Sequence, residues 1–300
     1  MRVVTEAAVK SRFESTPSLG VEDHTTTITM RDGAPSQIRT FRLPNVPTKG
    51  SSLIALVFGG GFTLGTNLQL APYARGLAAT YGATVVTLSY RLAPEHKFPV
   101  PSNDVWDSLE WITQNAESLG SDPLSGFVLG GPSAGANLVA TSAHIATVKP
   151  FRYPITGLWL GYPFLMSERH VPRKYRHLWL SRAQCANSPL LDSDDLGKIL
   201  DLYAPDEDSP TWSPFNIPGS FSSSKLPRTF IQVAGMDPLR DDALVYAKVL
   251  KEHGVETQVE VYPGMPHAFV MLPELKQTNE FNAHAFKGVG WLLGRAEYST

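Results

Sequence analysis

Cysteine is almost absent from this sequence of 300 residues, since Cys185 is the only one. A single cysteine excludes an intrachain disulfide and a multi-cysteine zinc site. A surplus of positive charge is missing as well, because 26 Lys and Arg side chains are balanced by 28 Asp and Glu side chains. We therefore expect neither a nucleic-acid partner nor binding to an anionic membrane surface.

Long apolar runs are also missing. Residues 53–62, among the longest, contain three glycines, and crossing a bilayer takes roughly 20 apolar residues. Charged side chains at positions 6, 10, 12 and 14 interrupt the region where a signal peptide needs an apolar segment. We expect a cytoplasmic protein with no membrane span.

Apolar, strand-like runs alternate with helical segments over most of the chain. Two runs at 25–30 and 37–43 flank a turn at 31–35 and predict an opening hairpin. Further strands are expected at 53–58, 83–90, 126–131, 155–162, 228–235 and 257–263, and helices at 72–81, 104–119, 134–148, 241–253 and 280–293. This alternation predicts one α/β domain over 1–300, with a mostly parallel sheet covered by helices on both faces. Between about 167 and 225 the alternation stops, which indicates an insertion over the sheet.

A candidate nucleophile, Ser133, lies in the sequence Gly131-Pro132-Ser133-Ala134-Gly135 between an expected strand and an Ala-rich helix. In that context GxSxG is typical of a nucleophile elbow, where a tight turn raises the hydroxyl above the sheet and small neighbours are required. The alternative is a glycine-rich turn with a serine that only caps the helix.

A serine nucleophile needs a base that is itself oriented by a carboxylate. Asp237 and His267 each follow an expected strand, in the chain order Ser, Asp, His. The carboxyl ends of parallel strands share one edge of a sheet, so the three loops could converge there. Asp241 and Asp242 are interpreted as capping the next helix. His96 and His144 precede Asp237 and so break the order.

Three glycines, Gly59 to Gly61, directly follow the strand at 53–58. In hydrolases with a nucleophile elbow, the loop at this place supplies an N–H donor for the oxyanion, and glycine lets the backbone approach a ligand closely. A phosphate loop is the alternative, but neither Gly-Lys-Ser/Thr nor GxGxxG follows. No cofactor and no metal are expected.

Together these motifs resemble those of the hormone-sensitive-lipase branch of the α/β-hydrolases, a carboxylesterase family, over about residues 53–293. The matching pieces, in chain order, are FGGGF at 58–62, YRLAPEHKFP at 90–99, GPSAGANL at 131–138, GMDPLRDD at 235–242 and PHAF at 266–269. The resemblance implies an α/β-hydrolase fold with a helical cap formed by about 1–22 and 167–225. It implies Ser133 as nucleophile, Asp237 as orienting carboxylate and His267 as base, with oxyanion donors at Gly60, Gly61 and Ala134. A narrower resemblance is to fungal versiconal hemiacetal acetate esterase-like enzymes of secondary metabolism.

Three positions depart from the family pattern. Phe58 replaces a histidine, Pro132 an aspartate and Ala136 a glycine. A phenyl ring cannot donate the histidine's hydrogen bond, so we expect aromatic packing to hold the glycine loop. Pro132 removes one backbone donor.

The substrate expected from the cap is an apolar small-molecule ester. Phe62, Trp179 and Trp212 are the candidate substrate-binding residues, although most aromatic residues of the cap are expected to form its own core. Hydrolysis through an acyl-enzyme is the expected reaction. Acyl transfer or cyclisation by the same triad, and a catalytically silent ligand-binding protein, remain alternatives. A homodimer is compatible with the sequence.

Overall fold

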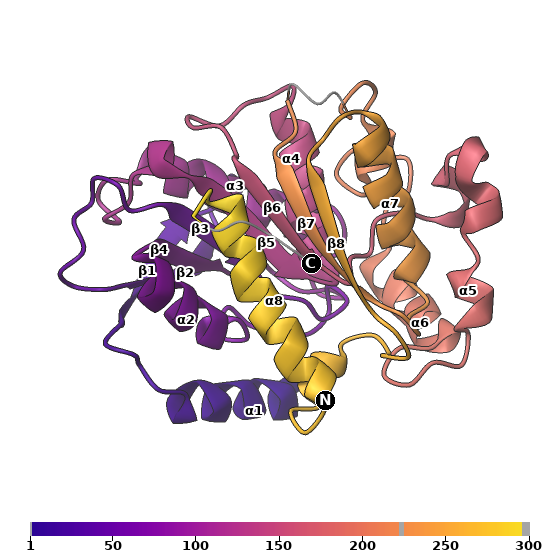
Figure 1. The fold of residues 1–300 in the computed structure, drawn as a ribbon, viewed down its shortest axis with the longest axis horizontal. Coiled ribbons are helices and arrows are strands. Elements are labelled where there is room, and N and C mark those ends of the chain that lie inside the picture. Colours follow the sequence, from indigo (N-terminus) through magenta and orange to yellow (C-terminus); the bar gives the residue numbers. More distant parts are fainter. Residues whose placement is uncertain (1, 222–224, 296–300) are drawn as a thin grey trace.

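One mixed sheet runs through the computed structural model, which describes residues 2–221 and 225–295 (Figure 1). Outside the described residues lie Met1 and 222–224, which belong to the predicted cap segments, and 296–300, which belong to the predicted domain. In the described part the sheet has eight strands, in the order β1-β2-β4-β3-β5-β6-β7-β8. Only β2 runs antiparallel to its neighbours β1 and β4, so the predicted mostly parallel sheet is confirmed.

The elements follow the predicted alternation. The strands are β1 (Glu22–Thr29), β2 (Pro35–Arg42), β3 (Leu53–Val57), β4 (Thr84–Leu88), β5 (Phe127–Pro132), β6 (Gly157–Gly161), β7 (Arg228–Ala234) and β8 (Thr257–Tyr262). The α-helices are α1 (Arg2–Ser15), α2 (Ala71–Tyr81), α3 (Val100–Gln114), α4 (Ala134–Ala146), α5 (Ser181–Gln184), α6 (Ser193–Tyr203), α7 (Arg240–Glu252) and α8 (Lys276–Leu292).

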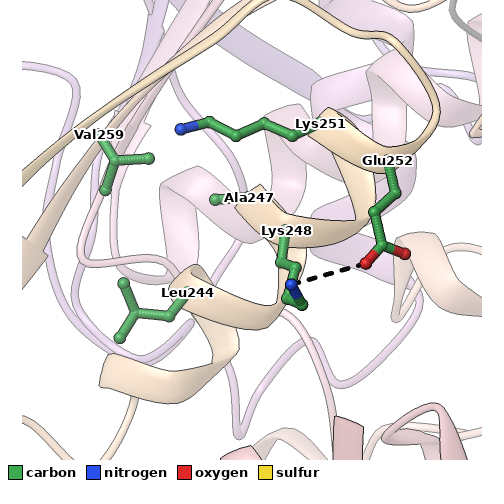
Figure 2. Close-up of a pocket in the computed structure, with 6 residues that line it drawn as sticks. All are labelled: Leu244, Ala247, Lys248, Lys251, Glu252 and Val259. Carbon is green, nitrogen blue, oxygen red and sulfur yellow. Dashed lines mark ion pairs between the residues drawn. The ribbon is translucent and has the colours of Figure 1, made fainter. Parts of the chain in front are cut away.

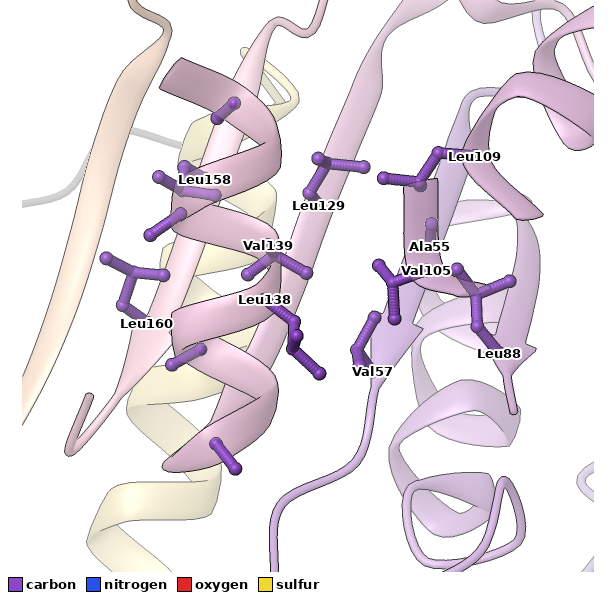
Figure 3. Packing of buried hydrophobic residues seen from close by; sticks show 14 of the residues in the cluster. Ala55, Val57, Leu88, Val105, Leu109, Leu129, Leu138, Val139, Leu158 and Leu160 are labelled. Atoms are coloured by element: carbon purple, nitrogen blue, oxygen red, sulfur yellow. The ribbon is translucent and has the colours of Figure 1, made fainter. Parts of the chain in front are cut away.

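Helices cover both faces of the sheet because the inner strands are apolar on both sides. All five residues of β3 are buried, and successive strand side chains point to opposite faces. Leu53, Ala55 and Val57 share one apolar cluster with residues of α3 and α4, as Figure 3 shows for part of this cluster. Ile54 and Leu56 pack with α2 and α8 on the other face. A strand without alternating polarity therefore specifies a sheet covered on both sides.

The bounds of α3 differ from the predicted 104–119. The helix begins at Val100 because Pro101 stands in its first turn, where a missing N–H costs no helical hydrogen bond. It ends at Gln114, and Asn115 forms its C-cap. The range predicted from the sequence, 104–119, therefore begins and ends several residues too late.

The segment predicted as an insertion holds short helical elements between β6 and β7. In its described part these are η2 (Glu168–His170), η3 (Arg173–Leu178), α5, α6 and η4 (Pro214–Asn216). Figure 1 places α5 and α6 beside α7, at the far side of the sheet from the β1–β2 hairpin. The N-terminal α1 lies elsewhere, below α2 in that view, and is held by Arg75, which donates to the carbonyls of Phe13 and Thr16.

A buried histidine joins α4, α7 and the inserted segment. Nδ1 of His144 lies 2.7 Å from Oγ of Ser220, and Nε2 lies 2.9 Å from the hydroxyl of Tyr246. The side chain is completely buried, and this burial lowers the pKa of His144 to about 3. The imidazole is therefore neutral at ordinary pH and serves as a polar link inside the core.

Acid is expected to weaken the fold through His144. The unfolded chain takes up this proton near pH 6.5, whereas the folded chain resists it down to about pH 3, so stability falls as the pH drops between those values. From pH 7 to pH 4 the loss is about 3 kcal/mol. Urea unfolding at several pH values should show this dependence in the wild type and a flatter one in His144→Gln. Equal pH dependence in the two proteins would contradict the assignment.

Candidate active site

The turn between β5 and α4 puts Ser133 in a strained conformation. Its φ is 52° and its ψ is −120°, a left-handed region that is costly for a residue with a side chain. The turn is tight because the chain passes close to β3: a Cβ atom on Gly135 would overlap the carbonyls of Val57 and Phe58. The amide of Ser133 donates to the carbonyl of Gly161 over 2.8 Å. These constraints match the geometry expected of a nucleophile elbow.

The structure brings the three predicted catalytic side chains together in one hydrogen-bonded chain. Oγ of Ser133 lies 2.9 Å from Nε2 of His267, and Nδ1 of His267 lies 2.7 Å from Oδ2 of Asp237. The other carboxylate oxygen, Oδ1, accepts the amide of Leu239 over 2.8 Å. Asp237 and His267 are both buried. This arrangement can remove a proton from the serine hydroxyl and stabilise the resulting imidazolium.

Tyr162, at the carboxyl end of β6, packs against the candidate base His267 and was not predicted from the sequence. Its ring centroid lies 5.0 Å from that of His267, with an interplanar angle of 75°. The residue has a positive φ of 33° and its amide donates to the carbonyl of Gln232. Its place after a central strand, at the edge where Ser133 also stands, is the signal that could have identified it.

The glycine loop after β3 offers free backbone donors. Gly60 has a φ of 129°, and a Cβ there would overlap the carbonyl of Leu64, so only glycine fits. Within residues 2–221 and 225–295, no protein oxygen accepts the N–H of Gly60, Gly61 or Ala134. Those are the three predicted oxyanion donors. Unpaired donors next to a nucleophile can stabilise charge that develops on a carbonyl oxygen.

Aromatic packing holds this loop at Phe58, as expected from the sequence. The buried phenyl ring stacks on Tyr90 with centroids 4.1 Å apart and an interplanar angle of 10°. The Tyr90 hydroxyl in turn donates to the carbonyl of Phe58 over 3.1 Å. The ring and the hydroxyl together fix the start of the glycine loop.

Two of the three predicted substrate-binding residues are packing residues in this structure. Phe62 and Trp212 are completely buried, so they present no surface to a ligand. Phe62 stacks on Tyr203 of α6 at 3.9 Å, and Trp212 packs beside both rings. Trp179 is half-buried, and its indole N–H donates to Asp242. Aromatic residues close to a site in the sequence can thus serve to pack the inserted segment onto the rest of the fold.

The acidic pair after Asp237 anchors the inserted segment. Oδ2 of Asp242 accepts the amides of Leu165 and Met166, and Oδ2 of Asp241 accepts those of Leu180 and Ser181. Both residues lie in the first turn of α7, but they bind another segment rather than cap their own helix as predicted. Burial raises the pKa of Asp242 above its usual value, although these donors and Arg182 oppose that shift.

Neither a metal site nor a membrane-spanning helix is found in the described part of the chain. Within 2–221 and 225–295, no three His, Cys, Asp or Glu side chains come together in a way that would hold a metal ion. None of the helices in these ranges combines the length and apolar composition required to cross a membrane.

A hollow lies on the outer surface of α7 and β8 (Figure 2). Its floor is formed by Leu244, Ala247 and Val259. Lys248 at its rim pairs with Glu252 over 3.6 Å. No catalytic candidate lines it, so it is separate from the Ser133 site.

Residues 54–271 match a family model described as the alpha/beta hydrolase fold. The chain belongs to this family. Carboxylesterase NlhH of Mycobacterium tuberculosis is 34% identical over 271 residues, which cover 87% of this chain and 79% of that protein. Versiconal hemiacetal acetate esterase of Dothistroma septosporum is 29% identical over 244 residues, or 81% of this chain and 74% of that protein.

Solved structures agree with this assignment. The crystal structure of vibralactone cyclase superposes with a TM-score of 0.88 at 33% identity, covering 97% of this chain and 86% of that one. The predicted α/β-hydrolase fold and the resemblance to the hormone-sensitive-lipase branch are confirmed. The prediction of an enzyme of the carboxylesterase-type serine hydrolases is also confirmed.

Proposed function

We propose that the enzyme hydrolyses an apolar small-molecule carboxylic ester with Ser133 as nucleophile, His267 as base and Asp237 as orienting carboxylate. The observation that carries the proposal is the unbroken hydrogen-bonded chain from Oγ of Ser133 through the imidazole to Asp237, with lengths of 2.9 and 2.7 Å. A serine hydroxyl is a weak nucleophile by itself, so a base in contact with it is the main requirement of the reaction.

The reaction has two halves. In the first, Nε2 of His267 takes the hydroxyl proton, Oγ of Ser133 attacks the ester carbon, and the proton passes to the leaving alcohol as the acyl-serine forms. In the second, His267 takes a proton from water, the hydroxide attacks the acyl carbon, and the acid leaves as the proton returns to Oγ. In both halves the N–H groups of Gly60, Gly61 and Ala134 stabilise the oxyanion.

We assign the inserted segment 167–225 as the cap over Ser133. Two contacts support this assignment: Nδ2 of Asn137, four residues after the nucleophile, donates to the carbonyl of Trp212 over 2.8 Å, and Ile199 of α6 lies against Gly61. Leu196, Ile199 and Leu200 of α6, which pack into or against the core, are apolar, and this favours an apolar ester over a sugar or a charged peptide. The similarity to versiconal hemiacetal acetate esterase supports a role in secondary metabolism.

Acyl transfer or cyclisation is the second candidate. The structural likeness to vibralactone cyclase favours it, because a triad that forms an acyl-enzyme can pass the acyl group to an alcohol of the same substrate when water is excluded.

Product analysis in water labelled with oxygen-18 tests the proposal. With p-nitrophenyl acetate as substrate, we expect one oxygen-18 atom in the released acetate. In a separate experiment, we expect a fluorophosphonate to modify Ser133 in the wild type but not in His267→Ala. For a hydroxy-ester, an unlabelled cyclic or transferred product would favour the second candidate. Failure of Ser133 to react with the fluorophosphonate would indicate a silent binding protein instead.

A further inference from the structure

We propose that Ile199 determines which esters the enzyme accepts, by limiting the acyl group to a short chain such as acetyl or propionyl. The inference rests on the proposed function, since it assumes an oxyanion at the glycine loop. Nothing in the sequence motifs points to this residue, because it lies in the inserted segment outside every matched motif. Its place over the loop comes from tertiary packing.

The side chain of Ile199 lies directly on Gly61. A Cβ atom built on Gly61 would be 2.8 Å from Cδ1, 3.0 Å from Cγ1 and 3.3 Å from Cγ2 of Ile199. The bonds from Cα to N and to Cβ are each about 1.5 Å, so Cδ1 lies within about 6 Å of the Gly61 nitrogen. In this proposal, an ester whose carbonyl oxygen binds that N–H places a substituent close to Ile199.

The acyl chain is the substituent that meets Ile199. In the tetrahedral intermediate, the leaving oxygen must face Nε2 of His267 to receive its proton, so the alcohol part extends beside His267 and Tyr162. The acyl chain occupies the remaining direction, away from the imidazole and along the glycine loop. With Ile199 in van der Waals contact with Gly61, there is no room for further methylene groups between α6 and the loop.

The position of Ile199 is fixed rather than adjustable. One turn further along α6, Tyr203 stacks on Phe62 with centroids 3.9 Å apart and an interplanar angle of 5°. The carbonyl of Tyr203 also accepts the amide of Phe98 over 3.0 Å. A β-branched side chain in a helix has one strongly preferred rotamer, so Ile199 cannot swing aside at low cost. A long acyl chain would have to displace α6 from the loop.

The test compares p-nitrophenyl esters from acetate to octanoate, with the alcohol held constant. We expect wild type to prefer acetate, and Ile199→Ala to raise the ratio of kcat/KM for octanoate over acetate at least tenfold. Ile199→Val removes only the terminal methyl and should lie between the two. Leu202→Ala, at an exposed position of the same helix, is the matched control and should keep the wild-type ratio.

Two results would overturn the inference while leaving the proposed function intact. The first is an unchanged dependence of kcat/KM on acyl-chain length in Ile199→Ala. The second is that Ile199→Ala changes kcat/KM only within a series of acetate esters that differ in the alcohol. The proposed function itself fails separately, if Ser133→Ala hydrolyses these esters as fast as wild type. Should simple esters turn over too slowly to compare, the rates at which p-nitrophenyl methyl- and octylphosphonates modify Ser133 give the same comparison. If the ratio of the octylphosphonate rate to the methylphosphonate rate were the same in wild type and Ile199→Ala, this would also reject the proposed role of Ile199.

Discussion

Replacing Ser133 by alanine is expected to lower kcat for p-nitrophenyl acetate by roughly four to six orders of magnitude. In the proposed mechanism the hydroxyl oxygen of Ser133 becomes acylated, and it lies 2.9 Å from Nε2 of His267. Without it, only the oxyanion donors and binding remain, and these still accelerate attack by water to a small extent. Steady-state kinetics with enzyme purified away from host esterases measures the difference.

Ser142→Ala is the matched control for this prediction. Ser142 is a buried serine within α4, the helix that begins directly after Ser133, and its hydroxyl donates to the carbonyl of Leu138 over 2.7 Å. Its removal should leave kcat close to the wild-type value. Equal rates for wild type and Ser133→Ala would remove this serine from the mechanism.

Asp237→Asn tests the orientation of His267 while leaving the Ser133 hydroxyl in place. The amide would keep the size of the carboxylate, but it would no longer select the correct tautomer of His267 or stabilise the imidazolium, so kcat should fall by about 10⁴. Fluorophosphonate labelling of Ser133 should slow in parallel. A variant with normal labelling and normal turnover would contradict the role of Asp237.

Phe58→Ala is expected to destabilise the protein by about 3 to 5 kcal/mol, the usual range for a fully buried phenyl ring. The ring stacks on Tyr90, and a Cβ on Gly65 would lie 2.5 Å from its Cδ2 atom, so its removal leaves a cavity under the glycine loop. Turnover should fall as well, because a loosened loop misplaces the N–H groups of Gly60 and Gly61. Denaturant unfolding and kcat are the two measurements.

An aromatic pair away from the glycine loop supplies the control for Phe58. Phe151 packs on Trp106 with centroids 4.5 Å apart, and neither residue belongs to the glycine loop. Phe151→Ala should lower stability but leave kcat per folded molecule unchanged. A loss of kcat that simply followed stability in both variants would contradict a specific role for Phe58 in the loop.

Phe58→His, which restores the family's histidine, is a second test of how position 58 affects the glycine loop. If Phe58→His lowers both stability and kcat, the ring is part of a working oxyanion loop. If it raises kcat for simple esters without loss of stability, the native loop is not arranged for them, and acyl transfer or cyclisation becomes the better assignment.

Much of the fold could be predicted from local patterns in the sequence. The double-sided burial of β3, β5 and β6 follows from their unbroken apolar runs, and the alternation of strands and helices implies parallel pairing. The position of Ser133 follows from a turn that only small neighbours permit. Asp237 and His267 could be predicted from the sequence because each follows a strand of a parallel sheet, and such strands end at a common edge. Their roles in catalysis are proposals that the variants above test.

The packing of the inserted segment depends on tertiary structure alone. Its composition is apolar and aromatic, but composition does not say which face of a short helix meets the sheet. Phe62 and Trp212 were expected at the substrate and instead pack together with Tyr203, while Ile199, which no motif distinguishes, lies on Gly61.

The physical reason is the range over which each interaction acts. A turn, a helix start or an apolar strand is specified by residues a few positions apart, so the sequence by itself determined the sheet and the order of the candidate catalytic residues. The partners of Asp242 lie 60, 63, 76 and 77 positions away in the chain, and those of His144 lie 76 and 102 positions away. Such pairings depend on how distant segments pack together, and only the tertiary structure decided them.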